Sequence, residues 1–447
     1  MSSEARSDLL HDLIRSALKA GADAAEAVVA ERRSLSVGVR LEELEEVERE
    51  ESRDLGLRIF VGRRQASVSA SDLSPRTCER LVERAVAMAR LAPEDPYGGL
   101  APKELLAKGP HPELELYDST EASAVELEER AREAESIARA VQGVTNSEGA
   151  SASWSTGQWR LVTSHGFEGE HRGSVFSLSV GVIAGDESGM ERGGEGRTTR
   201  WRTDLPSPEA IGRIAGERAV ARLGARKIDS RTAPVIVENR IAASMLSAFV
   251  GAISGPSVAR GVSFLKDKLG ERIFAPGFRI VDDPFRPRGL GSAPSDDEGV
   301  KVEKRALVED GVLTGWLLNS SSARQLGMTS TGHASRGLAG PPGVSTHNLY
   351  VEPGALDLKG LMREARTGLL VTSMFGPSLN ANTGDWSAGV SGVWFEGGEP
   401  AYPVTEITIA GNLIEVYGRL VAGSDLEFRS ATNSPSLLAD AIAIAGR

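Results

Sequence analysis

The chain has 447 residues, of which 40% are hydrophobic and 25% are charged, and its formal net charge is −11 at pH 7. These totals are typical of a water-soluble globular protein of two or three domains, and they exclude a fibrous or disordered one. The negative charge repels phosphate groups, so we expect neither nucleic acid nor an anionic membrane surface as a direct partner. Apolar runs are much shorter than the roughly eighteen residues of a membrane-spanning helix.

The cysteine content and the first residues bear on the cellular compartment. Cys78 is the single cysteine, so an internal disulfide cannot form. The N-terminal residues lack the basic segment and the apolar block of a secretory signal. We therefore expect a protein of the reducing cytoplasm.

Hydrophobic periodicity predicts helices and strands in the first half of the chain. Apolar residues at helical spacing predict helices over about 5–20, 75–92, 120–142 and 207–223. Alternating segments predict strands over about 24–31, 33–40, 57–61 and much of 144–203. The acidic run 42–51 is interpreted as a solvated edge or hairpin. A polar break at about 224–233 ends this half.

The second half is richer in strands and in glycine. We expect a strand over 234–237 and a helix over about 240–251. Asp310-Gly311 and Gly397-Gly398 tolerate the positive φ of tight hairpins and predict two of them. Because strands and helices alternate irregularly, the expected fold class is α+β, with antiparallel or mixed sheets and flanking helices. The predicted domains are residues 1–225, an α+β domain, and residues 226–447, a strand-rich α+β domain.

Six histidines are enough to build a metal site, and the best local candidate is the segment 165–171. It holds His165, Glu168, Glu170 and His171. The segment is predicted as strand–turn–strand, and its histidine spacing is not the i, i+4 pairing of a helical zinc site. We interpret these histidines as solvated surface residues. The sequence contains neither His-Glu-x-x-His nor a paired-cysteine motif.

Motifs of nucleophilic and nucleotide-dependent enzymes are also missing from the sequence. It has no Gly-x-Ser-x-Gly elbow between a strand and a helix. It has neither a phosphate loop nor a dinucleotide fingerprint. Cys78 lies on a predicted helix without a histidine near it in sequence, so we interpret it as a small packing residue.

Three polar, glycine-punctuated loops stand out in the second half, at 253–261, 330–335 and 383–387. Glycine lets backbone approach a ligand or another chain closely. Ordinary turns need the same residues. The loops are therefore candidates for binding, with a purely structural role as the alternative.

Several long blocks of the second half resemble one known family. They include Gly251-Ala-Ile-Ser-Gly-Pro-Ser-Val-Ala-Arg, Trp316-Leu-Leu-Asn-Ser-Ser-Ser-Ala-Arg-Gln-Leu-Gly, Ser330-Thr-Gly-His-Ala, Thr383-Gly-Asp-Trp-Ser and Tyr402-Pro-Val-Thr-Glu-Ile-Thr-Ile-Ala-Gly-Asn-Leu. The blocks are similar to the PmbA/TldE branch of the TldD/PmbA family, in the same order. The resemblance implies two α+β domains. It also implies partnership with a TldD-type subunit in a cytosolic zinc metallopeptidase that acts on unfolded, extended or precursor peptides.

In TldD-type chains of this family, a helix carries His-Glu-x-x-x-His, and a later cysteine completes the zinc site. Setting Gly261-Val-Ser against the Gly-Thr-Ser that follows this helix places Leu246, Ser247 and Gly251 at the His, Glu and His positions. None of them can hold zinc or act as a base. Cys78 lies in the wrong half to supply the third ligand. The resemblance implies a metal-free subunit without catalytic residues or cofactor of its own, with zinc in the TldD-type partner.

The three loops supply the expected contacts with the partner or with an extended peptide. The candidate residues are Arg260, Thr331, Gly332, His333, Asn380, Thr383, Gly384 and Asp385. An extended peptide can be held by pairing with a sheet edge, which is largely indifferent to sequence. In isolation, without its partner, the chain could form a homodimer.

Two other functions stay open on the sequence. The chain could be a self-sufficient, metal-independent hydrolase that uses His333 with Asp385 and a serine. It could instead be a regulatory, protein-binding subunit, for which the family resemblance suggests DNA gyrase as a partner.

Overall fold

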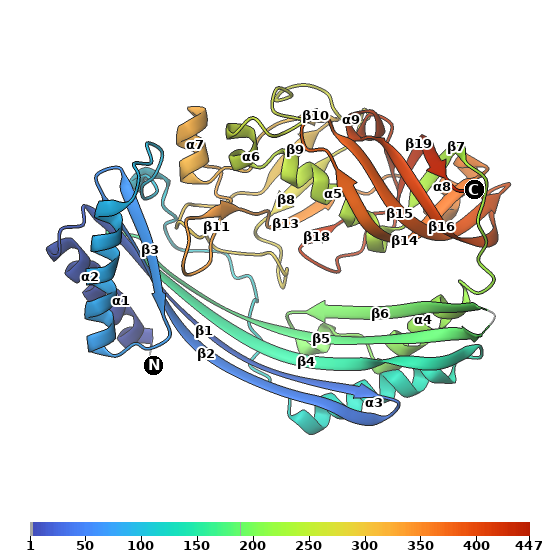
Figure 1. The fold of residues 1–447 in the computed structure, drawn as a ribbon, viewed down its shortest axis with the longest axis horizontal. Helices are drawn as coiled ribbons and strands as arrows, with labels where there is room; N and C mark the ends of the chain where they lie inside the picture. Colours follow the sequence, from blue (N-terminus) through green and yellow to red (C-terminus); the bar gives the residue numbers. More distant parts are fainter. Residues whose placement is uncertain (1–2, 188) are drawn as a thin grey trace.

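The computed structural model describes residues 3–187 and 189–447, and it has two halves that face each other (Figure 1). The helices of the first half are α1 (Ser3–Lys19), α2 (Pro75–Leu91), α3 (Ala124–Ala140) and α4 (Pro208–Val220), with 3₁₀ turns η1 (Lys103–Leu105) and η2 (Arg202–Asp204). Its strands are β1 (Ala24–Arg40), β2 (Glu43–Val61), β3 (Arg64–Ala70), β4 (Val144–Thr163), β5 (Glu168–Asp186) and β6 (Gly189–Thr199).

The second half holds the remaining elements. Its helices are α5 (Asn239–Ala252), α6 (Gly255–Ala259), α7 (Ser320–Leu326), α8 (Leu358–Ala365) and α9 (Leu413–Tyr417). Its strands are β7 (Arg231–Val237), β8 (Ile280–Asp283), β9 (Arg305–Glu309), β10 (Val312–Leu313), β11 (Ala334–Ser335), β12 (Gly343–Val344), β13 (Asn348–Val351), β14 (Gly368–Leu379), β15 (Asp385–Glu396), β16 (Glu399–Asn412), β17 (Val421–Ala422), β18 (Thr432–Asn433) and β19 (Leu437–Ala445).

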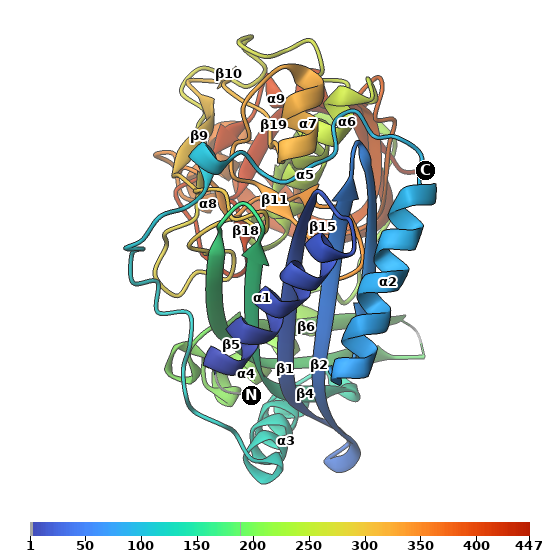
Figure 2. The same cartoon turned by 90° about the vertical axis from the view of Figure 1, so that its left-hand side faces the viewer.

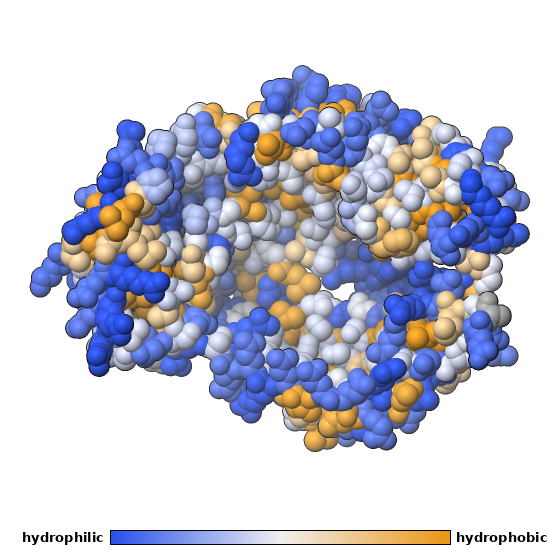
Figure 3. Space-filling view, viewed as in Figure 1, coloured by the Kyte–Doolittle hydropathy of each residue, from blue (hydrophilic) through white to orange (hydrophobic). Residues whose placement is uncertain are grey.

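The first half is one long, curved antiparallel sheet in the order β3-β2-β1-β4-β5-β6. Helices α1 and α2 cover one end of its outer face, and α3 and α4 cover the other end (Figures 1 and 2). Each pair buries its own apolar core against the strands. The other face of the sheet looks towards the second half (Figure 1), and the space-filling view shows a hollow between the two halves (Figure 3).

Two of the long strands extend beyond the sequence-based prediction: β2 begins at Glu43, although only about 57–61 was expected as strand, and β1 is continuous. The predicted strands 24–31 and 33–40 form a single strand, β1, because every residue of this stretch keeps its pairing with β2. The acidic run lies within β2, whose residues 43–51 are all exposed, and the positive φ of Leu41 and Glu42 makes the hairpin turn. The interpretation of this run as a solvated edge or hairpin is thus consistent with the structure.

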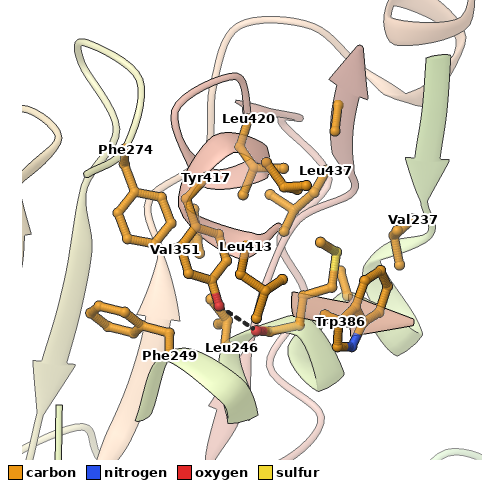
Figure 4. Close-up of a cluster of buried hydrophobic side chains, with 14 of the residues drawn as sticks. Val237, Leu246, Phe249, Phe274, Val351, Trp386, Leu413, Tyr417, Leu420 and Leu437 are labelled. Carbon is orange, nitrogen blue, oxygen red and sulfur yellow. Dashed lines mark hydrogen bonds between the residues drawn. The ribbon is translucent and has the colours of Figure 1, made fainter. Parts of the chain in front are cut away.

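The second half packs two mixed sheets and α5 around one large core. One sheet has the order β16-β15-β14-β7-β19-β17, with β14 parallel to β7; the other has the order β10-β9-β8-β13-β18, with β13 parallel to β18. Phe249 of α5 meets Phe274 and Tyr417 edge to face, with ring centroids 5.4 and 6.4 Å away (Figure 4). Such contacts add to the free energy of apolar burial. The structure confirms the α+β class with antiparallel and mixed sheets.

The two halves also share a buried ion-pair network. Glu26 of β1 accepts a hydrogen bond from Arg58 of β2 at 3.1 Å and another from Arg336 of the second half. These side chains are at most 2% exposed. The division into domains at residues 225 and 226 stays a prediction. Among the helices of the described residues, we find none with the length and apolarity needed to cross a bilayer.

Candidate functional site

Helix α5 carries the positions that the family resemblance compares with a zinc motif. Leu246 is 1% exposed and packs in the core beside Phe249 and Tyr417 (Figure 4). Ser247 and Gly251 lie on the exposed side of the helix, and an added Cβ at Gly251 would meet nothing within 4 Å. Positions five apart on a helix are separated by about 140° around its axis, so these residues do not converge on one point.

A catalytic metal does not fit these positions. Leu246 offers only carbon atoms and is committed to the core, and Gly251 has no side chain. Ser247 alone offers an oxygen, which is neutral and exposed. Zinc sites need histidine, cysteine or carboxylate ligands, and α5 contains none of these residue types.

A polar cleft separates the N-terminal half of α5 from the long sheet (Figure 3). Two adjoining cavities of about 350 and 360 Å³ lie along it, sharing Gly194, Arg218 and Arg240. One is bounded by β6, the start of α5 and the segment 427–433, and the other reaches β14 and β15. Because β6 is an edge strand of its sheet, the cleft is bordered by a strand with one unpaired side.

The arginines of this cleft are largely matched by carboxylates. Glu195 of β6 is buried and pairs with Arg197 at 3.2 Å, with Arg429 at 3.1 Å and with Arg218. Arg429 comes from the other half, so Glu195 joins the two sides of the cleft. Burial is the largest influence on Arg240 and lowers its pKa, and the charge of Glu238, 3.1 Å away, opposes that shift. Sequence reasoning missed this cluster because its members lie far apart in the chain.

The loops at 253–261 and 330–335 lie on either side of the segment 316–318. Gly255 donates its backbone N–H to the Leu317 carbonyl at 2.8 Å, and Leu318 donates its own to the Thr331 hydroxyl at 2.8 Å. Arg260, at the end of α6, is exposed, whereas Gly332 and His333 are buried. The structure thus brings these two loops together, with Arg260 at the surface.

The third loop is a separate hairpin tip between β14 and β15. Asn380, Thr383 and Asp385 are exposed, and Gly384 adopts a φ of +82° that favours glycine. A 2.6 Å hydrogen bond from the Thr383 hydroxyl, followed by one from Asn412, lowers the pKa of Asp385. These internal bonds hold the tip in one conformation.

His333 and Asp385 are bonded to different partners. His333 contacts Thr331 and Asp282, and Asp385 contacts Thr383 and Asn412. A catalytic dyad needs its base within hydrogen-bond reach of the residue that orients it. The arrangement required for a hydrolase built on His333 and Asp385 is therefore not assembled in this structure.

His333 belongs instead to a buried cluster that sequence reasoning missed. Its Nε2 lies 3.1 Å from Oδ2 of Asp282, and Nδ1 of His347 lies 2.8 Å from the same oxygen. Burial raises the pKa of Asp282, but the hydrogen bonds from both histidines outweigh it and bring that pKa to about 2. Burial also lowers the pKa of His333. No spacing rule could have found three residues separated by 51 and 14 positions.

The segment 165–171 does not form the ligand cluster that its composition suggested. His165 Nδ1 lies 3.0 Å from the Ala101 carbonyl. Glu168 accepts hydrogen bonds from Ser7 and Arg160, and Glu170 pairs with Arg6 and Arg160. His171 is partly buried, and burial, followed by the nearby charge of Arg200, lowers its pKa to about 4, so the interpretation of His171 as a solvated surface residue is wrong.

Comparison with known proteins identifies relatives along nearly the whole chain. Models of the PmbA/TldA metallopeptidase match as domain 1 at residues 25–89, as the central domain at 117–223 and as the C-terminal domain at 230–446. Metalloprotease PmbA of Escherichia coli is 38% identical over 99% of this chain and 98% of its own length. A PmbA homolog of Haemophilus influenzae is 39% identical over 96% and 94%.

Solved structures show the same fold. A crystal structure described as a modulator of DNA gyrase from Bacteroides thetaiotaomicron is 26% identical, covers 100% of both chains and superposes with a TM-score of 0.92. TldE from Thermococcus kodakarensis is 23% identical, with coverage of 98% and 100% and a TM-score of 0.87, and this likeness concerns the fold alone.

Proposed function

The chain belongs to the PmbA/TldE family of metallopeptidases, and we propose that it is the non-catalytic subunit of a cytosolic, heteromeric zinc metallopeptidase. Its role is to shape the channel through which unfolded or precursor peptides reach the zinc of a TldD-type partner. The observation that carries the proposal is the chemistry of α5. This helix is well packed, yet it has no His, Cys, Asp or Glu on any face.

The cleft supports a role in holding extended peptides. Its two adjoining cavities are lined by glycines of β6 and by paired charges rather than by a deep apolar pocket. An unpaired strand edge can hold an extended chain through backbone hydrogen bonds, with little regard for side-chain identity. Most strands of a folded protein are already paired within a sheet, so a site of this kind favours unfolded substrates.

The β14–β15 hairpin tip is the contact that we propose for the partner subunit. Leu379 is 38% exposed there, beside the polar Asn380, Thr383 and Asp385, and Phe375, farther along β14 and opposite Gly389, is 52% exposed. Exposed apolar side chains with a polar rim are typical of protein interfaces. Arg260 is a further exposed candidate. Gly384 sets the shape of the tip, and the buried His333 and Gly332 act by fixing the loop that carries Thr331.

Co-expression with the TldD-type chain tests this function. The isolated chain, treated with chelator, should not cleave unfolded casein, and the reconstituted pair should cleave it in a zinc-dependent way. Cleavage by the isolated, chelator-treated chain would contradict the proposal and favour a self-sufficient hydrolase. Failure of the two chains to co-purify would contradict the proposed partnership and favour a regulatory role with another protein.

Paired variants test the hairpin. Phe375→Glu should abolish co-purification with the TldD-type chain, because it places a charge in an apolar contact. Leu44→Glu is the matched control, since Leu44 is 45% exposed on the distant β1–β2 hairpin. Asp385→Ala should weaken pairing or proteolysis more mildly. If Phe375→Glu and Asp385→Ala both leave pairing and proteolysis intact, the hairpin is not the interface.

A further inference from the structure

The buried cluster of Asp282, His333 and His347 is built from three separate elements of the second half. Asp282 lies on β8, and His347 directly precedes β13, the antiparallel neighbour of β8. His333 directly precedes β11 in the 330–335 loop. The three residues are 0%, 1% and 8% exposed, in that order. Two strands and a loop thus direct three polar side chains to one interior point.

The atoms that meet there are ligand atoms. Asp282 Oδ2, His333 Nε2 and His347 Nδ1 all lie within 4.8 Å of one another. Their separations from the shared oxygen are 3.1 Å for His333 and 2.8 Å for His347. Ligands around a tetrahedral zinc ion, with bonds of about 2.0–2.2 Å, lie about 3.3–3.5 Å apart. An opening of a few tenths of an ångström would therefore bring the two histidine nitrogens to this spacing from the shared oxygen.

Each of two ligands is oriented by a second hydrogen bond. His333 Nδ1 lies 2.8 Å from the Thr331 hydroxyl, which itself accepts a bond from the Leu318 backbone. Asp282 Oδ1 accepts the His347 backbone N–H at 2.8 Å. Protein metal sites fix their imidazole and carboxylate ligands through such outer contacts. Nδ1 of His333 and Oδ1 of Asp282 are held by these bonds, and Nε2 of His333 and Oδ2 of Asp282 face each other.

The Asp282 carboxylate has no permanently charged partner. No lysine or arginine among residues 3–187 and 189–447 forms an ion pair with it, and the side chains that it pairs with are His333 and His347. A buried charge is costly unless it is paired or binds a metal. A divalent cation would turn this site into one with a single positive charge shared over three ligands.

We propose that Asp282, His333 and His347 bind a divalent transition-metal ion of the zinc type in the interior of the second half. Two imidazoles and one carboxylate suit zinc, whereas magnesium and calcium prefer oxygen ligands throughout. The burial of the site argues for a structural ion. It would join β8, β13 and the 330–335 loop, and it lies apart from α5, so it does not restore a catalytic metal to that helix.

Metal titration of the tag-free, full-length chain tests this site. After chelation and buffer exchange, Co²⁺ should bind with one equivalent and give the visible absorption of a nitrogen- and oxygen-ligated ion, and Zn²⁺ should displace it. Asp282→Asn and His347→Gln should each weaken Zn²⁺ binding by about 100-fold or more, beyond the loss typical of outer contacts. The matched control is His11→Gln, an exposed histidine on α1, which should leave binding unchanged.

Hydrogen exchange on the wild-type chain keeps the test decisive if the variants fail to fold. Zn²⁺ should slow amide exchange in the segments 280–283, 330–336 and 345–351, and not in 165–171. Absence of stoichiometric binding overturns the proposal. Binding that spares these segments, or that the folded variants retain, also overturns it. Either result would leave the proposed pairing with a TldD-type chain untouched, because that is measured by co-purification and cleavage.

Discussion

The two histidine pairs of this chain show how sequence distance and spatial distance can diverge. His165 and His171 are six positions apart with two glutamates between them, yet they do not meet: His165 contacts the Ala101 carbonyl, and the charge of Arg200 acts on His171. His333 and His347 are 14 positions apart, and both reach the same carboxylate oxygen. The closely spaced residues of 165–171 lie along the β4–β5 turn and β5 without meeting, whereas the widely spaced His333 and His347 meet in the core. Convergence depends on which strands pair, and local spacing does not report that.

The largest difference in stability is expected between the loss of the Asp282 carboxylate in the buried cluster and the loss of the Glu168 carboxylate in the segment 165–171. In chelator-treated protein, Asp282→Ala should reduce the free energy of unfolding by about 3–5 kcal/mol, because two buried imidazoles lose their acceptor. Glu168→Ala should cost less than about 1 kcal/mol, since its side chain is 39% exposed and Arg160 keeps Glu170. Urea unfolding of both variants measures the difference. Equal costs would remove the distinction between the two clusters.

Lowering the pH should reduce the stability of the fold through His171. The pKa of His171 is about 4 in the folded chain and 6.5 in the unfolded one, so the unfolded state takes up a proton first as the pH falls. The stability that His171 contributes is complete above pH 6.5 and is lost between pH 6.5 and 4, by at most about 3 kcal/mol. His171→Gln should flatten the pH dependence of urea midpoints over this window. An unchanged slope in His171→Gln would show that another group is responsible.

Thr331 offers a smaller test of the buried cluster. Thr331→Val removes a hydroxyl that serves both His333 and the Leu318 backbone, at an expected cost of about 1–2 kcal/mol in chemical denaturation. The matched variant is Thr383→Val, whose hydroxyl bonds the exposed Asp385. It should cost under about 0.5 kcal/mol. A larger effect at Thr383 would place the more rigid network at the hairpin tip instead.

The smallest change in stability is expected on α5, the helix that carries the positions compared with the zinc motif. Gly251→Ala should stabilise the isolated chain by about 0.5 kcal/mol, because alanine favours the helix and its Cβ meets open space. If this face receives a peptide or the partner, the same variant should weaken proteolysis by the pair. Thermal unfolding and cleavage assays measure the two effects. A destabilised chain would mean that Gly251 has a packing role in the isolated chain.

Local signals predicted the helices closely. The expected helices at 75–92 and 240–251 correspond to α2 and α5, because Ser74 caps α2 and the apolar residues of α5 repeat at helical spacing. The strand β1 was expected in two pieces, because arginines and serines interrupt its alternation. Pairing on both sides with β2 and β4 overrides that local weakness.

The candidate site was predictable only where it is contiguous. The predicted loop 383–387 overlaps the tip that joins β14 to β15, but its residues 385–387 belong to β15; Arg260 lies at the end of the predicted loop 253–261. The cleft around Glu195 and the cluster around Asp282 each unite residues that lie far apart in the chain. Their partners follow from sheet order, which a single sequence leaves undetermined.

Glu26 has a consequence for any attempt to cut this chain in two. Arg226 and Lys227, in the segment that links the two halves, are exposed, and Glu26 binds Arg58 on one side of a cut made there and Arg336 on the other. Separating the two pieces would leave the buried Glu26 carboxylate and the Arg58 and Arg336 guanidinium groups without their full set of partners. A nicked chain should therefore migrate as one particle under native conditions, and its halves are better regarded as complementing fragments than as independently expressible modules.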